Sequence, residues 1–286
     1  MRDFNENTAT NAVLERLSGA EDVRFKEIMT SVIRHLHAVV REVEPTSEEW
    51  MAAIKFLTAT GQICDDKRQE FILLSDTLGV SMLIDAINNR KPSGATESTV
   101  LGPFHVANAP RKAMGETISL DGKGDPTFVS GRVVDQDGGP IEGATLDVWQ
   151  TSSDGAYDIQ DPEQPEMNLR GVFTTGKDGR FWFRTVKPSS YPIPTDGPVG
   201  KMLVAMSRHP MRPAHIHFII AAPGFEPVTT HMFVEGDEYL ESDAVFGVKD
   251  SLVVPFMLRD DPTDAKRLGL ASPFYTAEHE FRLIPV

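Results

Sequence analysis

The chain has 286 residues, 40% of them hydrophobic and 8% aromatic, which is enough for one large domain with an appendage or for two domains. Its 42 acidic and 28 basic residues give a net charge of −14, so nucleic acid and anionic membrane surfaces are excluded as expected partners. The single cysteine, Cys64, excludes an intramolecular disulfide and a Cys-rich metal site, and with no signal peptide or membrane-spanning run recognisable, a cytoplasmic location is expected.

The first third of the chain is predicted to be helical. Apolar residues recur at spacings of three and four from residue 25 to residue 43, which is typical of a helix with one buried face. Thr46 followed by Glu49 forms a capping box that opens a second helix, and Asp65 or Asp66 can cap a third. These signals predict an N-terminal segment made of helices.

From about residue 100 onward the pattern changes to short apolar runs separated by turns. Gly, Pro, Thr and Val become frequent, and turn signals such as DQDGGP and KDGR divide the runs. Seven or more strands without intervening helices are typical of a β-sandwich or a β-barrel. The expected strands are 128–134, 144–150, 180–186, 214–220, 230–234, 252–258 and 280–284.

The stretch RPAHIHF, residues 212–218, contains two histidines at a spacing of two. Side chains alternate between the faces of a strand, so His215 and His217 are expected on one face and Ile216 on the other. Two imidazoles on one face indicate a metal site, although the same pattern also occurs on wet sheet faces without a ligand role.

Tyrosine is scarce, with four in the chain, and two of these follow predicted strands. Tyr157 lies in TSSDGAYD and Tyr191 lies in KPSSYPIP, at strand ends where functional sites are often built. The ordinary interpretation is a half-buried ring with a hydrogen-bonded hydroxyl. Holding a phenolate at pH 7 costs about 4 kcal/mol, which a hard trivalent cation can offset. Two tyrosines with two histidines therefore indicate Fe(III).

Four segments in this order resemble the intradiol ring-cleavage dioxygenases: TESTVLGPFHV (96–106), GRVVDQDGGPIEGATLDVWQTSSDGAYD (131–158), GRFWFRTVKPSSYPIP (179–194) and RPAHIHF. The resemblance covers nearly the whole chain. It implies a mainly β fold, with a β-sandwich catalytic domain over residues 96–286 and a helical dimerisation and linker segment over residues 1–95. It also implies a homodimer formed through the N-terminal helices, with phospholipid held between them in some members of the family.

The resemblance further assigns the metal site and the reaction. Tyr157, Tyr191, His215 and His217 would be the ligands of one Fe(3+) per subunit, and Arg212 would face the substrate. Tyr191 would leave the metal when a diol binds and accept a substrate proton, so it and Arg212 are the expected catalytic residues. The enzyme would use O2 to cleave an aromatic diol between its two hydroxylated carbons, giving a muconate.

Two features resemble the hydroxyquinol 1,2-dioxygenases within this family. The catechol branch usually has glutamine sixteen residues after the first histidine ligand, whereas this chain has His231, and the loop SYPIPTDGPVG also matches the hydroxyquinol branch. The implied reaction converts benzene-1,2,4-triol to 3-hydroxy-cis,cis-muconate and then maleylacetate, in the catabolism of aromatic compounds. The implied substrate pocket comprises Leu73, Asp76, Val100, Leu101, Gly102, Pro103, Phe104, Ile193, Pro194, Arg212, His231 and Val245.

The sequence is also compatible with structural roles for these residues and with other functions. The apolar pocket residues could be core packing, and Asp76 could be a helix-surface carboxylate. A catechol or chlorocatechol 1,2-dioxygenase is the nearest alternative. A non-enzymatic, prealbumin-like β-sandwich binding module and a zinc hydrolase are rivals from other classes.

Overall fold

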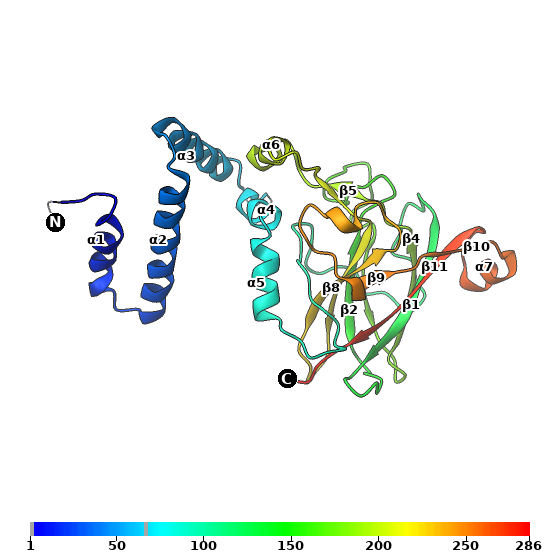
Figure 1. Ribbon diagram of the computed structural model, residues 1–286. Helices are drawn as coiled ribbons and strands as arrows, with labels where there is room; N and C mark the ends of the chain where they lie inside the picture. The colour runs from blue at the N-terminus through cyan, green and yellow to red at the C-terminus, as the bar shows by residue number, and fades with distance from the viewer. Residues whose placement is uncertain (1–2, 66–67) are drawn as a thin grey trace. The chain divides into compact units, whose positions relative to one another are not determined.

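The computed structural model describes residues 3–65 and 68–286, and the chain forms two compact units, residues 1–59 and 60–286 (Figure 1). The last helices before the sandwich, α4 (Glu70–Thr77) and α5 (Val80–Asn88), therefore belong to the same unit as the sandwich. A functional division of the chain at residue 95 stays a prediction. Among the described residues, no helix combines the length and apolarity needed to cross a membrane.

The N-terminal unit consists of helices. Asp22 caps the longest of them by accepting a hydrogen bond from the backbone N–H of Phe25 at 2.9 Å, and Glu44 ends it in the left-handed conformation. The apolar face predicted to be buried is exposed in the single chain, as with Phe25 at 53% and Leu36 at 60%. The elements are α1 (Ala9–Glu15), η1 (Arg16–Gly19), α2 (Val23–Val43) and the start of α3 (Ser47–Gln62).

The predicted capping box is confirmed, and one of the two alternative caps predicted for the third helix is wrong. The Glu49 N–H donates to Thr46 Oγ1 at 3.2 Å, and the Thr46 N–H donates back to Glu49 Oε2 at 2.8 Å. Asp65 does not cap α4, because it accepts a hydrogen bond from the Arg68 N–H in the preceding turn while α4 begins at Glu70. Asp66 lies outside the described residues.

The second unit contains a β-sandwich, as expected, with two main sheets and a small two-stranded sheet. One main sheet has the order β10-β11-β1-β4 and the other the order β3-β2-β7-β8-β9. β1 pairs with β11, and β8 with β9, in parallel, and the remaining pairs are antiparallel. The strands are β1 (Pro126–Val134), β2 (Thr145–Gln150), β3 (Arg170–Thr174), β4 (Arg180–Val186), β5 (Tyr191–Pro192), β6 (Met211–Arg212), β7 (His215–Ala221), β8 (Val228–Val234), β9 (Val253–Val254), β10 (Met257–Arg259) and β11 (Phe274–Arg282).

The hydrophobic core lies between the two main sheets. Phe181 and Phe183 of β4 pack in one cluster with Ile216 and Phe218 of β7, and all four are fully or almost fully buried. Since side chains alternate along a strand, this places His215 and His217 on the outer face of the five-stranded sheet. The core therefore fixes the face on which the histidines meet.

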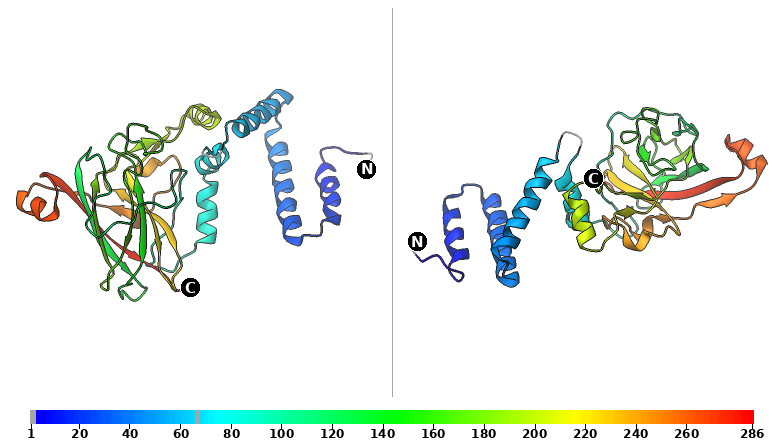
Figure 2. Two further views of the ribbon diagram at one scale, coloured as in Figure 1. Left: turned by 180° about the vertical axis from the view of Figure 1, so that it is seen from behind. Right: turned by 90° about the horizontal axis from the view of Figure 1, so that it is seen from above.

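The predicted strands occur with shifted ends, and one of them is divided. The predicted strand 252–258 is divided at Pro255, which has no N–H for a ladder hydrogen bond, and β9 lies in one main sheet while β10 lies in the other. Also present, and not predicted from the sequence, are the strands β3, β5 and β6 and the short helices α6 (Pro198–Ala205) and α7 (Pro262–Leu268). In three views α7 lies at the far end of the β10–β11 pair, away from the other strands of the two main sheets (Figures 1 and 2).

Candidate metal centre

The two histidines of β7 meet the two predicted tyrosine ligands in one cluster. His215 Nε2 lies 3.0 Å from His217 Nε2, which lies 3.0 Å from the Tyr157 hydroxyl oxygen. The hydroxyl oxygens of Tyr157 and Tyr191 are 3.3 Å apart. All four side chains are at most 3% exposed. Ligand atoms that share a metal ion at about 2.0–2.1 Å lie roughly 3 Å from one another, so these four atoms converge as a ligand set would.

The ring of His217 is held between its cross-strand neighbours. Trp149 of β2 and His231 of β8 are its register partners on either side. The Trp149 ring stacks on His217 with centroids 4.5 Å apart at 10°, and the His231 ring lies 4.1 Å away at 53°. This row of aromatic rings orients His217 Nε2 toward the cluster.

The Tyr157 ring is fixed by the residues next to it. Phe104 stacks on it with ring centroids 4.5 Å apart. The neighbouring Asp158 accepts hydrogen bonds from Arg170 Nε at 2.8 Å and Nη2 at 2.6 Å, and the two charged side chains are almost fully buried. This ion pair, which was not predicted from the sequence, ties the loop of Tyr157 to β3.

Tyr191 lies in the short strand β5, and this places it beside Arg212. The strands β5 and β6 pair Tyr191 directly with Arg212. Arg212 Nη1 lies 3.3 Å from the Tyr191 hydroxyl oxygen and 3.3 Å from His215 Nε2. Asp237 links the two ligand segments, because its carboxylate accepts from the Ser190 hydroxyl at 2.6 Å and from the Ala214 N–H at 3.0 Å.

The protonation of the cluster suits a cation. Burial, with the charge of Arg212, holds the pKa of His215 well below its usual range, and burial with neighbouring positive groups does the same for His217. His215 donates through Nδ1 to the Pro213 carbonyl at 2.7 Å, which leaves the Nε2 lone pair directed at the cluster. Burial, followed by the nearby Tyr191, raises the pKa of Tyr157 well above its usual range, so a phenolate there needs a strong positive charge.

His231 is a third imidazole at this site. Nitrogen atoms of His215, His217 and His231 lie within 4.8 Å of one another. His231 is fully buried, and among the described residues neither of its nitrogens has a hydrogen-bond partner. The donor set of imidazoles and phenols therefore fits a metal ion, and buried nitrogens without partners are left beside it.

Most of the predicted pocket residues line two cavities in the same compact unit. The cavities have volumes of about 420 and 190 Å³ and share Ile72, Asp76 and Pro103. The larger is also lined by Val100, Leu101 and Gly102, and the smaller by Leu73, Phe104 and Pro194. Neither cavity is lined by Arg212 and His231, which lie beside the predicted ligands, or by Ile193 and Val245, which pack in one hydrophobic cluster with Leu73. Phe104 links the smaller cavity to the four predicted metal ligands, since it also contacts Tyr157.

The family models, relatives and solved structures that match this chain are dioxygenases. Residues 100–281 match the family model described as "Dioxygenase", and residues 22–96 match "Catechol dioxygenase N terminus". The hydroxyquinol 1,2-dioxygenase of Rhizobium sp. (strain MTP-10005) is 57% identical, covering 98% of this chain and 96% of that protein. The crystal structure of hydroxyquinol 1,2-dioxygenase from Pseudomonas putida DLL-E4 matches with a TM-score of 0.93 and 51% identity over 98% of this chain and 99% of that one. Catechol 1,2-dioxygenase of Acinetobacter radioresistens matches with a TM-score of 0.88 and 28% identity over 100% and 95%.

Gly102 allows the segment LGPF to lie directly against His217, and its replacement should disturb the cluster. A Cβ at Gly102 would lie 3.3 Å from His217 Cε1, and the residue has a φ of +75°. Gly94 has a similar φ of +85° but open space around it. We expect Gly102→Ala and Gly94→Ala each to lose about 1–2 kcal/mol of stability, but only Gly102→Ala to lower metal content. Thermal unfolding with metal analysis measures both, and equal metal content in the two variants would contradict the contact.

Proposed function

The chain belongs to the intradiol ring-cleavage dioxygenase family, and from that premise we propose that it cleaves hydroxyquinol at an Fe(III) centre held by Tyr157, Tyr191, His215 and His217. The observation that carries the proposal is that the four donor atoms lie close together, with neighbouring atoms 3.0–3.3 Å apart. Membership of the family removes the binding module and the zinc hydrolase as rivals. Catechol and chlorocatechol stay as alternative substrates.

The identity of the metal follows from the chemistry of the donors. Two phenolates and two neutral imidazoles favour a hard trivalent ion over Zn²⁺, because phenolate formation in a buried site needs a high positive charge. Fe(III) held there would supply Lewis-acid and redox chemistry for a diol and O2. Our proposal is one such ion in each chain.

The roles of Tyr191 and Arg212 follow from their positions. Tyr191 is the ligand that lies beside Arg212, and in the proposal its phenolate oxygen accepts a proton from a substrate hydroxyl. Arg212 keeps its positive charge next to the cluster, and its guanidinium stabilises negative charge that develops on the substrate ring. Both side chains are at most 3% exposed, so water does not weaken these interactions.

The choice of hydroxyquinol rests on the relatives and on Asp76. The chain is 57% and 51% identical to proteins named as hydroxyquinol 1,2-dioxygenases and 28% identical to the catechol enzyme. Asp76 is 5% exposed and lines both cavities. Burial raises the pKa of Asp76, and the Ser81 hydroxyl and the Arg212 charge oppose that rise. In our proposal the Asp76 carboxylate accepts a hydrogen bond from the third hydroxyl of the substrate.

His231 is proposed to face the substrate as well. Its fully buried ring contacts both His215 and His217, and its nitrogens have no partners among the described residues. A buried polar atom without a partner is costly unless a ligand completes it. A substrate hydroxyl beside the metal would do so.

Helix α2 is the proposed dimer surface. Apolar side chains along one face of the helix are 41–65% exposed in the single chain, and they form a contiguous stripe of the kind that another protein covers. The residues are Phe25, Ile28, Val32, Leu36, Val39, Val40 and Val43. We propose a homodimer formed through this stripe, with phospholipid as a further occupant of the same apolar face.

Removal of single ligands should separate their roles. We expect Tyr157→Phe and His215→Ala to lose iron, because each leaves three of four protein ligands. Tyr191→Phe should retain more iron than Tyr157→Phe, with a shifted visible band and a much lower turnover rate. Metal analysis and absorption spectra measure these differences. Full iron in Tyr157→Phe, or an unchanged spectrum in Tyr191→Phe, would remove that residue from the ligand set.

Replacement of Asp76 should reduce discrimination between triol and diol. A charge-assisted hydrogen bond contributes about 1.5–3 kcal/mol, so Asp76→Ala should narrow the hydroxyquinol-to-catechol ratio of kcat/KM roughly tenfold to a hundredfold. Asp85 lines the larger cavity, but both of its carboxylate oxygens already accept hydrogen bonds, from Asn89 Nδ2 at 2.8 Å and from the Ser98 hydroxyl at 3.0 Å, so Asp85→Asn is a matched control that should keep the ratio. A wild-type preference for catechol would overturn the substrate assignment.

The dimer proposal is tested by molecular mass in solution. Light scattering at micromolar concentration should give twice the mass of the chain, and Leu36→Glu on the apolar stripe of α2 should shift the protein toward monomer. Arg34→Glu, on the same helix but outside the stripe, should leave the dimer intact. A monomeric wild-type protein would contradict the proposal.

A further inference from the structure

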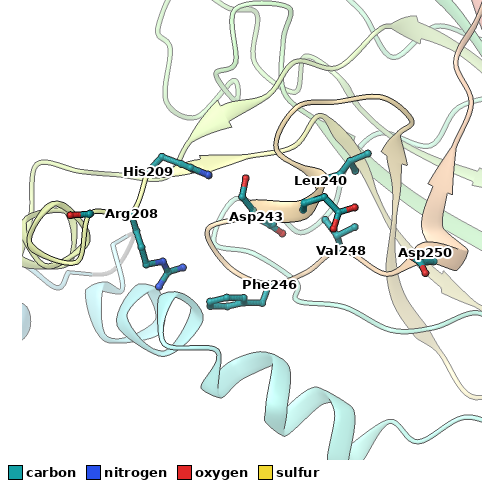
Figure 3. A pocket seen from close by; sticks show the side chains of 10 residues that line it. Arg208, His209, Leu240, Asp243, Phe246, Val248 and Asp250 are labelled. Atoms are coloured by element: carbon teal, nitrogen blue, oxygen red, sulfur yellow. The ribbon is translucent and has the colours of Figure 1, made fainter.

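Asp243 lies behind Arg212, in the turn that follows the short helix η2 (Leu240–Ser242). Its side chain is 2% exposed and accepts three hydrogen bonds: from Arg212 Nε at 3.2 Å, from the Val245 N–H at 3.3 Å and from the Gly247 N–H at 2.9 Å. On its other side it borders a cavity of about 510 Å³ that Arg208, Phe246 and Asp250 also line (Figure 3). The backbone of its own turn thus holds the carboxylate in place.

This carboxylate fixes the plane of the Arg212 guanidinium. A guanidinium is planar, so a hydrogen bond at Nε determines where both terminal nitrogens point. Nη1 then lies 3.3 Å from the Tyr191 hydroxyl oxygen and from His215 Nε2. Among the described residues, Nη2 has no hydrogen-bond partner although it is buried. Asp243 therefore binds one edge of the guanidinium, and Nη2 remains free as a donor.

Gly247 leaves the space that this arrangement requires. A Cβ at this position would lie 3.1 Å from Asp243 Oδ2 and 3.2 Å from Arg212 Nη2. The ion pair also balances charge, because Arg212 and Asp243 are both buried and an unpaired charge there would be strongly unfavourable. No other carboxylate among the described residues forms a hydrogen bond with Arg212.

We propose that Asp243 is a positioning residue for the ring-cleavage reaction. Its carboxylate holds the Arg212 guanidinium in one orientation beside the proposed iron ligands. Asp243 acts on the substrate only through Arg212. This inference rests on the proposed function, in which Arg212 stabilises negative charge on the substrate. The residue that positions Arg212 thus comes from a loop about thirty residues further along the chain.

The test is a double-mutant cycle on hydroxyquinol cleavage. Asp243→Asn keeps the shape of the side chain and removes its charge, and it should lower kcat roughly tenfold to a hundredfold with little change in KM. Iron content, the visible band and anaerobic hydroxyquinol binding should stay near wild type, since the four ligands are intact. In an Arg212→Ala background, Asp243→Asn should change kcat less than about twofold, because its effect depends on Arg212.

Two further variants keep the test decisive. Asp250→Asn changes an exposed carboxylate that borders the same cavity and should leave kcat unchanged. Asp243→Ser serves as a second replacement if thermal unfolding shows that Asp243→Asn is poorly folded, and it should give the same dependence on Arg212. An equal loss of kcat in the wild-type and Arg212→Ala backgrounds, or no loss of kcat in either, would overturn the role of Asp243. A wild-type protein that does not cleave hydroxyquinol would instead overturn the proposed function.

Discussion

The site depends on the alternation of side chains in β7. Ile216 and Phe218 are drawn into the core between the sheets, and this forces His215 and His217 onto the outer face, with their Nε2 atoms 3.0 Å apart. Two imidazoles enclosed so closely, with pKa values lowered by burial, present lone pairs that water does not reach. The other parts of the site are arranged around this pair of nitrogens.

Buried or half-buried carboxylates hold the segments that complete the site. Asp158 joins the Tyr157 loop to β3 through Arg170, Asp237 bridges the segments before Tyr191 and His215, and Asp243 holds Arg212. Each carboxylate accepts at least two hydrogen bonds, so the buried charges are compensated rather than isolated. Tyr157 and Tyr191 can thus be held rigidly although one lies in a loop and the other in a two-residue strand, because these charged hydrogen bonds limit the movement of the segments that carry them.

Local patterns in the sequence predicted the parts of the structure that depend on local physics. The period of two in AHIHFII predicted the shared face of the histidines, and the Thr46–Glu49 pair predicted a capping box with both hydrogen bonds in place. The expected site residues on LGPF and the tyrosine segments came from resemblance, and the structure brings them together around the cluster. The exposed stripe of α2 was expected to be buried, since periodicity shows that a face is apolar but not what covers it.

The supporting contacts could not be predicted in the same way. Asp243 lies 31 residues after Arg212, and a single aspartate in a loop carries no signal of its partner. Pro255 gave a signal for the division of strand 252–258, since it cannot donate to a ladder, but the move from one sheet to the other depends on tertiary structure. Short elements such as β5 and β6 exist because Tyr191 and Arg212 pair, and their lengths leave no periodic pattern.

The central claim, that two tyrosines and two histidines together hold Fe(III), is tested most directly by the purified protein itself. Metal analysis combined with visible absorption and resonance Raman spectroscopy measures the identity of the ion and its bonds to tyrosinate. We predict one iron per chain, a tyrosinate-to-iron charge-transfer band and tyrosinate vibrations enhanced in that band. A colourless protein that contains zinc, or iron without tyrosinate vibrations, would contradict it.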